Sequence, residues 1–295
     1  MFYDRFALEG EGTANRVHND VTKPPHGRFR PLPAHFDIIS NIMDEQLKAL
    51  LVQTLTATQP LAEAASVSDA RFLVTLLGIY RVSFATLRDI DELASDEGTG
   101  PSMLDLARKI MEHGISVEYM ILKGKEKMAE RFQEYLTVQA HDEIEFFKSI
   151  GQDPAHLSPD LQINVADVEK NYAALSKDTR DRKTWAGQSV EGMLADLHKA
   201  GALNDFDASR IGIGYVWGSR LNHPNPLVVH GYLEPEEHRL ANSFYSRLAI
   251  LMALSFHLRL ATRLIDESRF NASSNIYPEV ATEIQAIQTE LNTMC

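Results

Sequence analysis

The sequence contains almost no cysteine, and the usual metal-binding motifs are missing. The one cysteine among the 295 residues is Cys295, at the last position, which excludes a disulfide framework or a cysteine zinc site within the chain. None of the eleven histidines has a glutamate three positions before it, as a di-iron helical bundle requires. No His-Glu-x-x-His and no phosphate-cradling glycine-rich loop occurs either. The sequence therefore predicts neither a metal site nor a cofactor.

Basic residues are outnumbered by acidic ones, and the formal net charge is −12. Sequence-independent binding of nucleic acid needs a surface that neutralises phosphates. The charge balance therefore argues against broad binding to DNA or RNA, although it leaves a local RNA contact open.

Long apolar runs are also missing. The most apolar stretch, LAILMALSFHLRLA, is interrupted by His257 and Arg259, so we predict that it is too short and too polar to span a bilayer. The first residues include acids where a signal peptide would need an apolar core. We therefore expect no membrane association and a cytoplasmic location.

Along most of the chain, apolar residues recur every three or four positions, which is the period of an amphipathic helix. No sustained period-two alternation indicates a strand. We predict an all-α fold: a polar, irregular N-terminal arm over residues 1–34 and one multi-helix bundle over 35–295, with about eight or nine helices. The predicted helices cover about 35–55, 68–94, 102–123, 126–150, 165–181, a short segment ending at Gly201, 205–221, 235–268 and 278–293.

Two charged residues lie on helix faces that should be buried. Glu118 falls in the middle of the apolar stripe of its helix, and Arg247 falls within the stripe of the long helix near the C-terminus. A buried charge needs a counter-charge, so the two are predicted to pair with each other or with Arg108, Arg220 or His223. Such a network either fixes helix register or forms a ligand-binding or catalytic polar centre.

A short pattern on the helix over about 102–123 resembles a ribonuclease motif. Many HEPN proteins, which are helical and metal-independent ribonucleases, carry Arg, about four to six residues, and then His. RKIMEH, from Arg108 to His113, has that spacing, but Arg28 and Arg30 also precede His35 suitably, and about two matches are expected by chance. Residues five apart on one helix also project about 140° from each other.

The segment YVWGSRLNHPNP, residues 215–226, is predicted to be the end of a helix. Pro224 disfavours helical geometry at His223, so the helix must stop there with Arg220 in its last turn. We predict that Ser219 and His223 turn inward and meet Arg108 and Glu112, an i,i+4 pair, in one side-chain network. On this interpretation the main role of His223 is to hold the end of the helix in position.

Several motifs together resemble the bacterial domain-of-unknown-function family fifty-six seventy-seven. The motifs are ARKIMEHGISVEYMI, RFQEYL, KTWAGQSVEGMLADL and YVWGSRLNHPNP, in this order over about residues 70–265. The resemblance implies an all-helical protein, and it marks a set of positions: Arg108, Glu112, Tyr119, Arg131, Phe132, Trp185, Tyr215, Ser219, His223 and Pro224. The family has no established activity, and more distantly it is similar to abortive-infection and HEPN-like proteins.

Two functions follow as hypotheses. The first is an interaction or sensor protein of bacterial stress response or phage defence, whose polar centre is structural or binds a small ligand. The alternative is a metal-independent ribonuclease in which His is general acid or base and Arg stabilises the transition state; a homodimer with paired histidines would favour it. The candidate catalytic residues are Arg108, Glu112, His113 and His223, and the candidate polar-centre residues are Glu118, Tyr119, Trp185, Tyr215, Ser219, Arg220 and Arg247.

Overall fold

The computed structural model describes residues 34–64, 70–96, 98–154, 164–203, 211, 215, 235–268 and 276–294, and the side chains of 34–43, 235–241 and 276–277 are not described. These residues form nine helices and no strand, so the predicted all-α class is confirmed. The helices are α1 (Ala34–Glu63), α2 (Arg71–Leu93), α3 (Gly100–Lys123), α4 (Lys125–Ser149), α5 (Val165–Ala174), α6 (Lys177–Arg180), α7 (Val190–Lys199), α10 (Pro235–Ser268) and α11 (Ile276–Thr293).

Most predicted helix positions agree with the structure, because the capping signals act locally. Asn164 caps α5 as predicted: its side-chain oxygen accepts hydrogen bonds from the backbone N–H groups of Ala166 and Asp167. The four-residue helix α6 was not predicted as a separate element. Of the predicted helix over 205–221, only Ile211 and Tyr215 are described, both as helical, and the predicted arm lies outside the described residues up to position 33.

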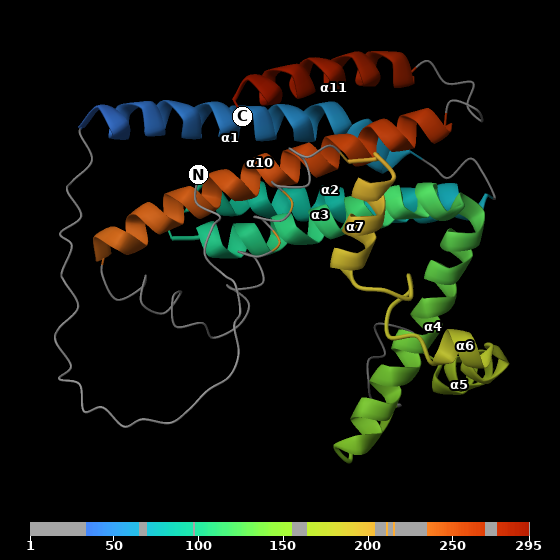
Figure 1. Ribbon diagram of the computed structural model, residues 1–295. Helices are drawn as coiled ribbons and strands as arrows, with labels where there is room; N and C mark the ends of the chain where they lie inside the picture. Colours follow the sequence, from blue (N-terminus) through green and yellow to red (C-terminus); the bar gives the residue numbers. More distant parts are fainter. Residues whose placement is uncertain are drawn as a thin grey trace, which may run out of the picture. The chain divides into compact units, whose positions relative to one another are not determined.

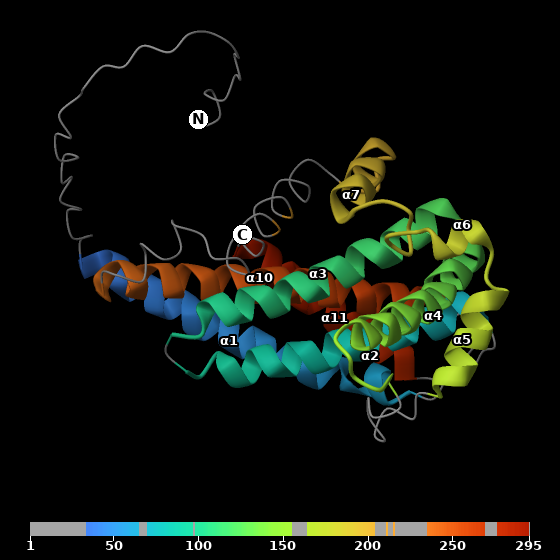
Figure 2. The ribbon, with the colours of Figure 1, turned by 90° about the horizontal axis from the view of Figure 1, so that it is seen from below.

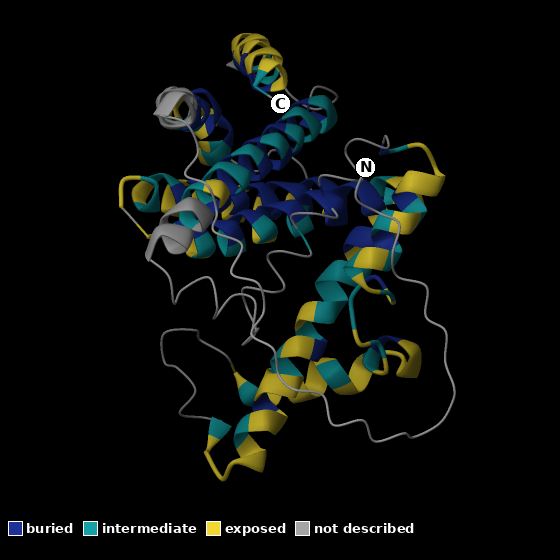
Figure 3. Cartoon of the chain, turned by 60° about the vertical axis from the view of Figure 1, so that its left-hand side comes forward, coloured by how far each residue is buried: buried dark blue, intermediate teal, exposed yellow. Residues whose placement is uncertain are grey.

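The chain divides into two compact units, residues 1–39 and 40–295, and the second holds the core. Within this unit α10 is the central helix: it packs along α2 and α3 and also contacts α11 (Figures 1 and 2). Buried residues concentrate on these helices, whereas α4, α5 and α6 form a more exposed group (Figure 3). The bundle around α10 is therefore the part of the molecule that can hold side chains in fixed positions.

The central position of α10 explains its apolar composition. Within the described residues, the segment Asn242–Ser268 is the one stretch that is long and apolar enough to cross a membrane, contrary to the prediction that this region is too short. Yet 67% of its most apolar window is buried inside the bundle. The predicted bounds of this helix, 235–268, agree with the structure, and core packing accounts for its apolar composition.

A buried polar network ties α10 to α1 and α2 around His257, which has no solvent exposure. Its Nε2 lies 3.1 Å from the Thr58 hydroxyl and its Nδ1 lies 3.0 Å from the Ser83 hydroxyl. Thr58 donates its own hydrogen to the carbonyl of Thr54, so it must accept from Nε2–H, and Ser83 must donate to Nδ1. The Tyr80 ring stacks on the imidazole at 5.1 Å. Burial lowers the pKa of His257 to about 3, so the ring is neutral.

The start of α3 approaches α10 so closely that only glycine fits at position 100. A Cβ atom on Gly100 would lie 2.3 Å from the backbone oxygen of Asn242 and 2.9 Å from Ser246 Oγ. Gly78, on the outer face of α2, would meet nothing within 4 Å. The close contact is therefore specific to the α3–α10 junction.

We expect opposite effects from alanine at these two glycines. Gly100→Ala should lower the free energy of unfolding by about 1–3 kcal/mol, since the neighbouring atom is backbone and cannot move aside cheaply. Gly78→Ala should raise it by about 0.5–1 kcal/mol, because alanine favours the helix and has open space. Urea denaturation of both variants measures this, and a stable Gly100→Ala protein would contradict the packing.

Candidate functional site

A cluster of charged residues joins α3 to α7 and to Tyr215. The Nε of Arg108 donates to Glu112 Oε1 at 2.8 Å, which confirms the predicted i,i+4 pair. The guanidinium also lies over the Tyr215 ring, 4.6 Å from its centroid. A cation held against an aromatic face is attracted by the ring quadrupole. Through this contact, Arg108 holds Tyr215, the first residue of the YVWGSRLNHPNP segment, against the side of α3.

Glu191, in the first turn of α7, completes this cluster, which we call the α3–α7 polar cluster (Arg108, Glu112, Glu191 and Tyr215). The Tyr215 hydroxyl donates to the Glu191 carboxylate. Hydrogen bonds from its own backbone N–H, from Ser189 and from Tyr215 lower the pKa of Glu191, while burial, followed by the bond to Glu191, raises the pKa of Tyr215. Glu112 pairs with the Arg108 guanidinium and Glu191 adds a second negative charge to the cluster, so the cluster is unsuited to bind a phosphate.

The aromatic residues of the family-like motifs gather nearby. Trp185 meets the Tyr119 ring edge-on with centroids 6.2 Å apart, and the Phe132 ring at 5.3 Å. These rings come from α3, from α4 and from the loop before α7, so they pack three segments together. Edge-to-face pairs of this kind stabilise the packing of the segments that carry the rings.

Glu118 is buried between α3 and α10, where it accepts hydrogen bonds from two arginines. Its side chain is 5% exposed. Arg259 Nε donates to Oε1 at 2.9 Å, and Arg263 donates to Oε1 at 2.8 Å and to Oε2 at 2.9 Å. The prediction that Glu118 needs a counter-charge is therefore confirmed, but its partners were not among the residues proposed.

Arg247 pairs with Asp44 of α1, so the predicted pairing of Glu118 with Arg247 is wrong. Two nitrogens of the Arg247 guanidinium donate to the two Asp44 carboxylate oxygens, at 2.5 and 3.1 Å. Arg247 and Arg263 are both on α10, but they are sixteen positions, more than four helical turns, apart along the chain. Each therefore meets a different neighbour: α1 near the start of α10, and α3 near its end.

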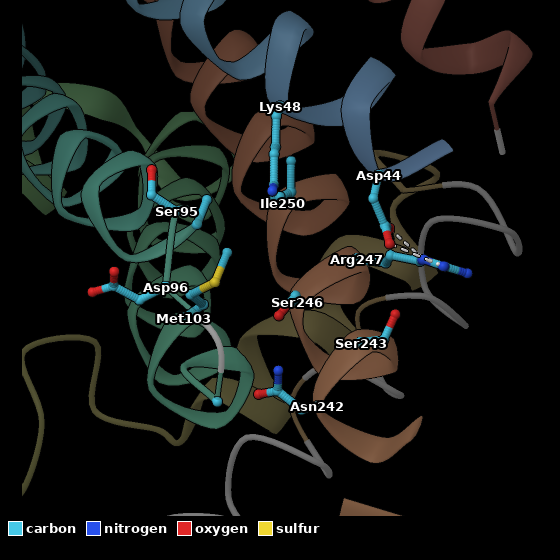
Figure 4. Close-up of a pocket in the computed structure, with 12 residues that line it drawn as sticks. Asp44, Lys48, Ser95, Asp96, Met103, Asn242, Ser243, Ser246, Arg247 and Ile250 are labelled. Carbon is cyan, nitrogen blue, oxygen red and sulfur yellow. Dashed lines mark hydrogen bonds and ion pairs between the residues drawn. The ribbon is translucent and has the colours of Figure 1, made fainter. Parts of the chain in front are cut away.

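A pocket of about 580 Å³ opens beside the Arg247–Asp44 pair. We call it the α1–α3–α10 pocket, because α1, the turn between α2 and α3, the start of α3 and the first half of α10 supply its walls (Figure 4). Its volume lies within the usual range for small-molecule sites. Most of the lining residues have polar side chains, but apolar atoms, including those of Met103 and Ile250, supply about half of the lining surface. The walls also include Asp44, Lys48, Ala94, Ser95, Asp96, Gly98, Asn242, Ser243, Ser246 and Arg247.

The close contact at Gly100 shapes one wall of this pocket. The backbone N–H of Gly100 donates to Asn242 Oδ1 at 2.7 Å, which caps the start of α3 from α10. Since a carbonyl oxygen must face this donor, the Asn242 amide nitrogen points the other way, towards Ser246 in Figure 4. The pocket is therefore held by a fixed helix–helix junction.

The chain was compared with known protein families, curated proteins and solved structures. A model described as "Family of unknown function (DUF5677)" matches residues 74–240, more than half of the sequence. The chain belongs to this family. No curated protein and no solved structure matches it. The match agrees with the resemblance of the sequence motifs and covers the α3–α7 polar cluster entirely, whereas Asp44, Lys48 and Arg247 lie outside it.

In this DUF5677 protein the candidate catalytic residues are only partly described. Ser219, Arg220 and His223 lie outside the described residues, so their predicted convergence with Arg108 and Glu112 stays a prediction. His113 is half-buried, and its Nδ1 has no hydrogen-bond partner among the described residues. Burial, then the charge of Lys109, lowers the pKa of His113.

Sequence analysis missed Glu191, Asp44, Lys48 and Asn242. The signal for Glu191 was present, because an acid in the first turn after a Ser N-cap is favoured by the helix dipole, but that explanation needs no site. Nothing distinguished the other three from ordinary polar residues of amphipathic helices. Across the described residues, no group of three or more His, Cys, Asp or Glu could hold a metal ion.

Proposed function

We propose that this DUF5677 protein is a helical sensor that binds a small ligand in the α1–α3–α10 pocket and responds through contacts with another macromolecule. The pocket is the observation that carries the proposal, since it offers a ligand-sized space with walls from three separate helices and with polar groups from α1, from α10 and from the α2–α3 turn. A ligand there would bridge Lys48 of α1 to Asn242 of α10 and to the turn around Asp96. Binding would therefore change how tightly these helices hold together.

The resemblance to abortive-infection proteins supports a setting in bacterial stress response or phage defence, with a cytoplasmic location and a homodimer as further parts of the proposal. The buried cluster of Glu118, Arg259 and Arg263 (the Glu118 cluster) and the α3–α7 polar cluster then hold the helices of the sensor in fixed positions. Each of their charges already has a partner, as expected for side chains that position helices.

The ribonuclease alternative has less support from the geometry. Arg108 already pairs with Glu112 and lies against the Tyr215 ring, so it is not free to stabilise a developing phosphorane charge. His113 lies five residues further along the same helix, about 140° around its axis.

Incubation with total RNA and transfer RNA in EDTA decides this alternative: cleavage abolished by His113→Ala or His223→Ala, in protein that still folds, would establish a nuclease.

A thermal-shift screen with a library of small polar metabolites tests the sensor proposal. A compound present at about 100 times its Kd stabilises the folded protein by about 2.7 kcal/mol, which raises the melting temperature by several °C in a chain of this size. We expect at least one such compound. Ser95→Trp should abolish its effect, because Ser95 is an exposed residue of the pocket wall.

The matched control is Ser149→Trp, at the exposed end of α4 and outside the pocket, which should leave the shift unchanged. Compounds that stabilise both tryptophan variants as strongly as the wild type would bind elsewhere and would contradict the proposal.

A further inference from the structure

We propose that the ligand of the α1–α3–α10 pocket is a small organic anion, carrying a carboxylate or phosphate group that pairs with Lys48. This inference rests on the proposed function and specifies its ligand class. It follows from the charged groups and the hydrogen-bond donors of the pocket walls.

Lys48 supplies the charge. Figure 4 shows its side chain running from α1 towards the space between the α2–α3 turn and α10. Within the described residues its one ion pair is with Glu45, at 3.8 Å, and the Glu45 side chain is 78% exposed. Such a long, exposed contact on one helix holds an ammonium weakly. Lys48 therefore remains available to an anion, to which its three N–H groups can donate.

The two acids of the pocket do not cancel this charge. Asp44 is already neutralised by the two hydrogen bonds from Arg247. Asp96 is exposed on the α2–α3 turn, and in Figure 4 its carboxylate points away from Lys48. Lys48 is therefore the charged group that faces the pocket without a close counter-charge among the described residues.

Two uncharged groups of the pocket walls can donate hydrogen bonds to a ligand. The Asn242 oxygen is taken by the Gly100 N–H, which leaves the amide nitrogen, a donor, on the side towards Ser246. The Ser246 hydroxyl lies beside it and can also donate. Together with the Lys48 ammonium in the same pocket, these donors are complementary to a ligand rich in acceptor oxygens. Met103 and Ile250 add apolar surface for its carbon skeleton.

Matched pairs of compounds test the ligand class, with binding followed by thermal shift and calorimetry at constant ionic strength. The pairs are glucose 6-phosphate with glucose, AMP with adenosine, and succinate with succinamide, so that phosphate and carboxylate are distinguished. We expect at least one anion to bind while its neutral partner does not. Lys48→Met should weaken that anion at least tenfold, and Lys48→Arg should restore most of the affinity.

Lys109→Met is the control, because Lys109 is similarly exposed, lies outside the pocket and pairs with Asp105 at 3.6 Å. It should leave the affinity unchanged. An anion that binds equally well to the Lys48→Met variant would overturn the proposal, as would binding of neither member of every pair. Neutral or cationic compounds that bind the wild type and are lost in Ser95→Trp would overturn the anionic class while leaving the sensor function standing.

Discussion

Wild-type protein should lose about 3 kcal/mol of stability between pH 7.5 and pH 4.5 through His257 alone. Burial depresses the pKa of this histidine to about 3 in the folded protein, against the ordinary value of 6.5 in the unfolded chain. Between these values the unfolded chain binds one proton more, so stability rises with pH, by about 1.4 kcal/mol per pH unit. The contribution is fully present above pH 6.5 and falls as the pH drops towards 3.

Urea denaturation at pH 7.5, 6.5, 5.5 and 4.5 measures this slope. His257→Gln removes the titrating ring and keeps an amide that can bond to Thr58 or Ser83, so its stability should change with pH by about 3 kcal/mol less than that of the wild type over the same range. The same change at the exposed His198 should leave the profile as in the wild type. Parallel profiles for wild type and His257→Gln would show that His257 can be protonated in the folded protein.

Glu118→Gln should lower the free energy of unfolding by about 3 kcal/mol, at the lower end of the range for breaking a buried ion pair. The substitution removes the charge that holds Arg259 and Arg263 together and replaces one acceptor oxygen with a donor. The lower end applies because the two arginine side chains are 29% and 36% exposed and can regain some hydration.

Glu112→Gln is the matched control on the same helix. Glu112 pairs with Arg108, and its side chain is 32% exposed, so the expected cost is about 0.5 kcal/mol, as for other i,i+4 pairs. Chemical denaturation of both variants at pH 7.5 compares them directly. Equal costs would mean that the Glu118 cluster does not hold α3 to α10.

The helices could be predicted from the sequence because caps and apolar periodicity are local. The same periodicity marked Glu118 and Arg247 as charges on buried faces, and both proved to be paired across helices. Their partners could not be predicted, since the partner depends on which helices lie side by side and at what height. Asp44 of α1 pairs with Arg247 near the start of α10, whereas Glu118 of α3 pairs with Arg263 near its end, for that reason alone.

The polar network of His257 left no sequence signal either. Threonine and serine can satisfy themselves inside a helix by bonding to the carbonyl four residues back, as Thr54 does to Leu50. Thr58 and Ser83 therefore look like ordinary helix residues until α1, α2 and α10 are assembled. The pocket is hidden in the same way, because it depends on the contact between Gly100 and Asn242.

Hydrogen exchange of the wild-type protein, with and without a compound found in the thermal-shift screen, tests the sensor account most directly. A ligand in the α1–α3–α10 pocket should slow amide exchange in residues 44–50, 94–103 and 242–250 together, because those segments form its walls. Protection confined to residues 105–123 and 185–199, around the α3–α7 polar cluster, would contradict the account and place the ligand there instead.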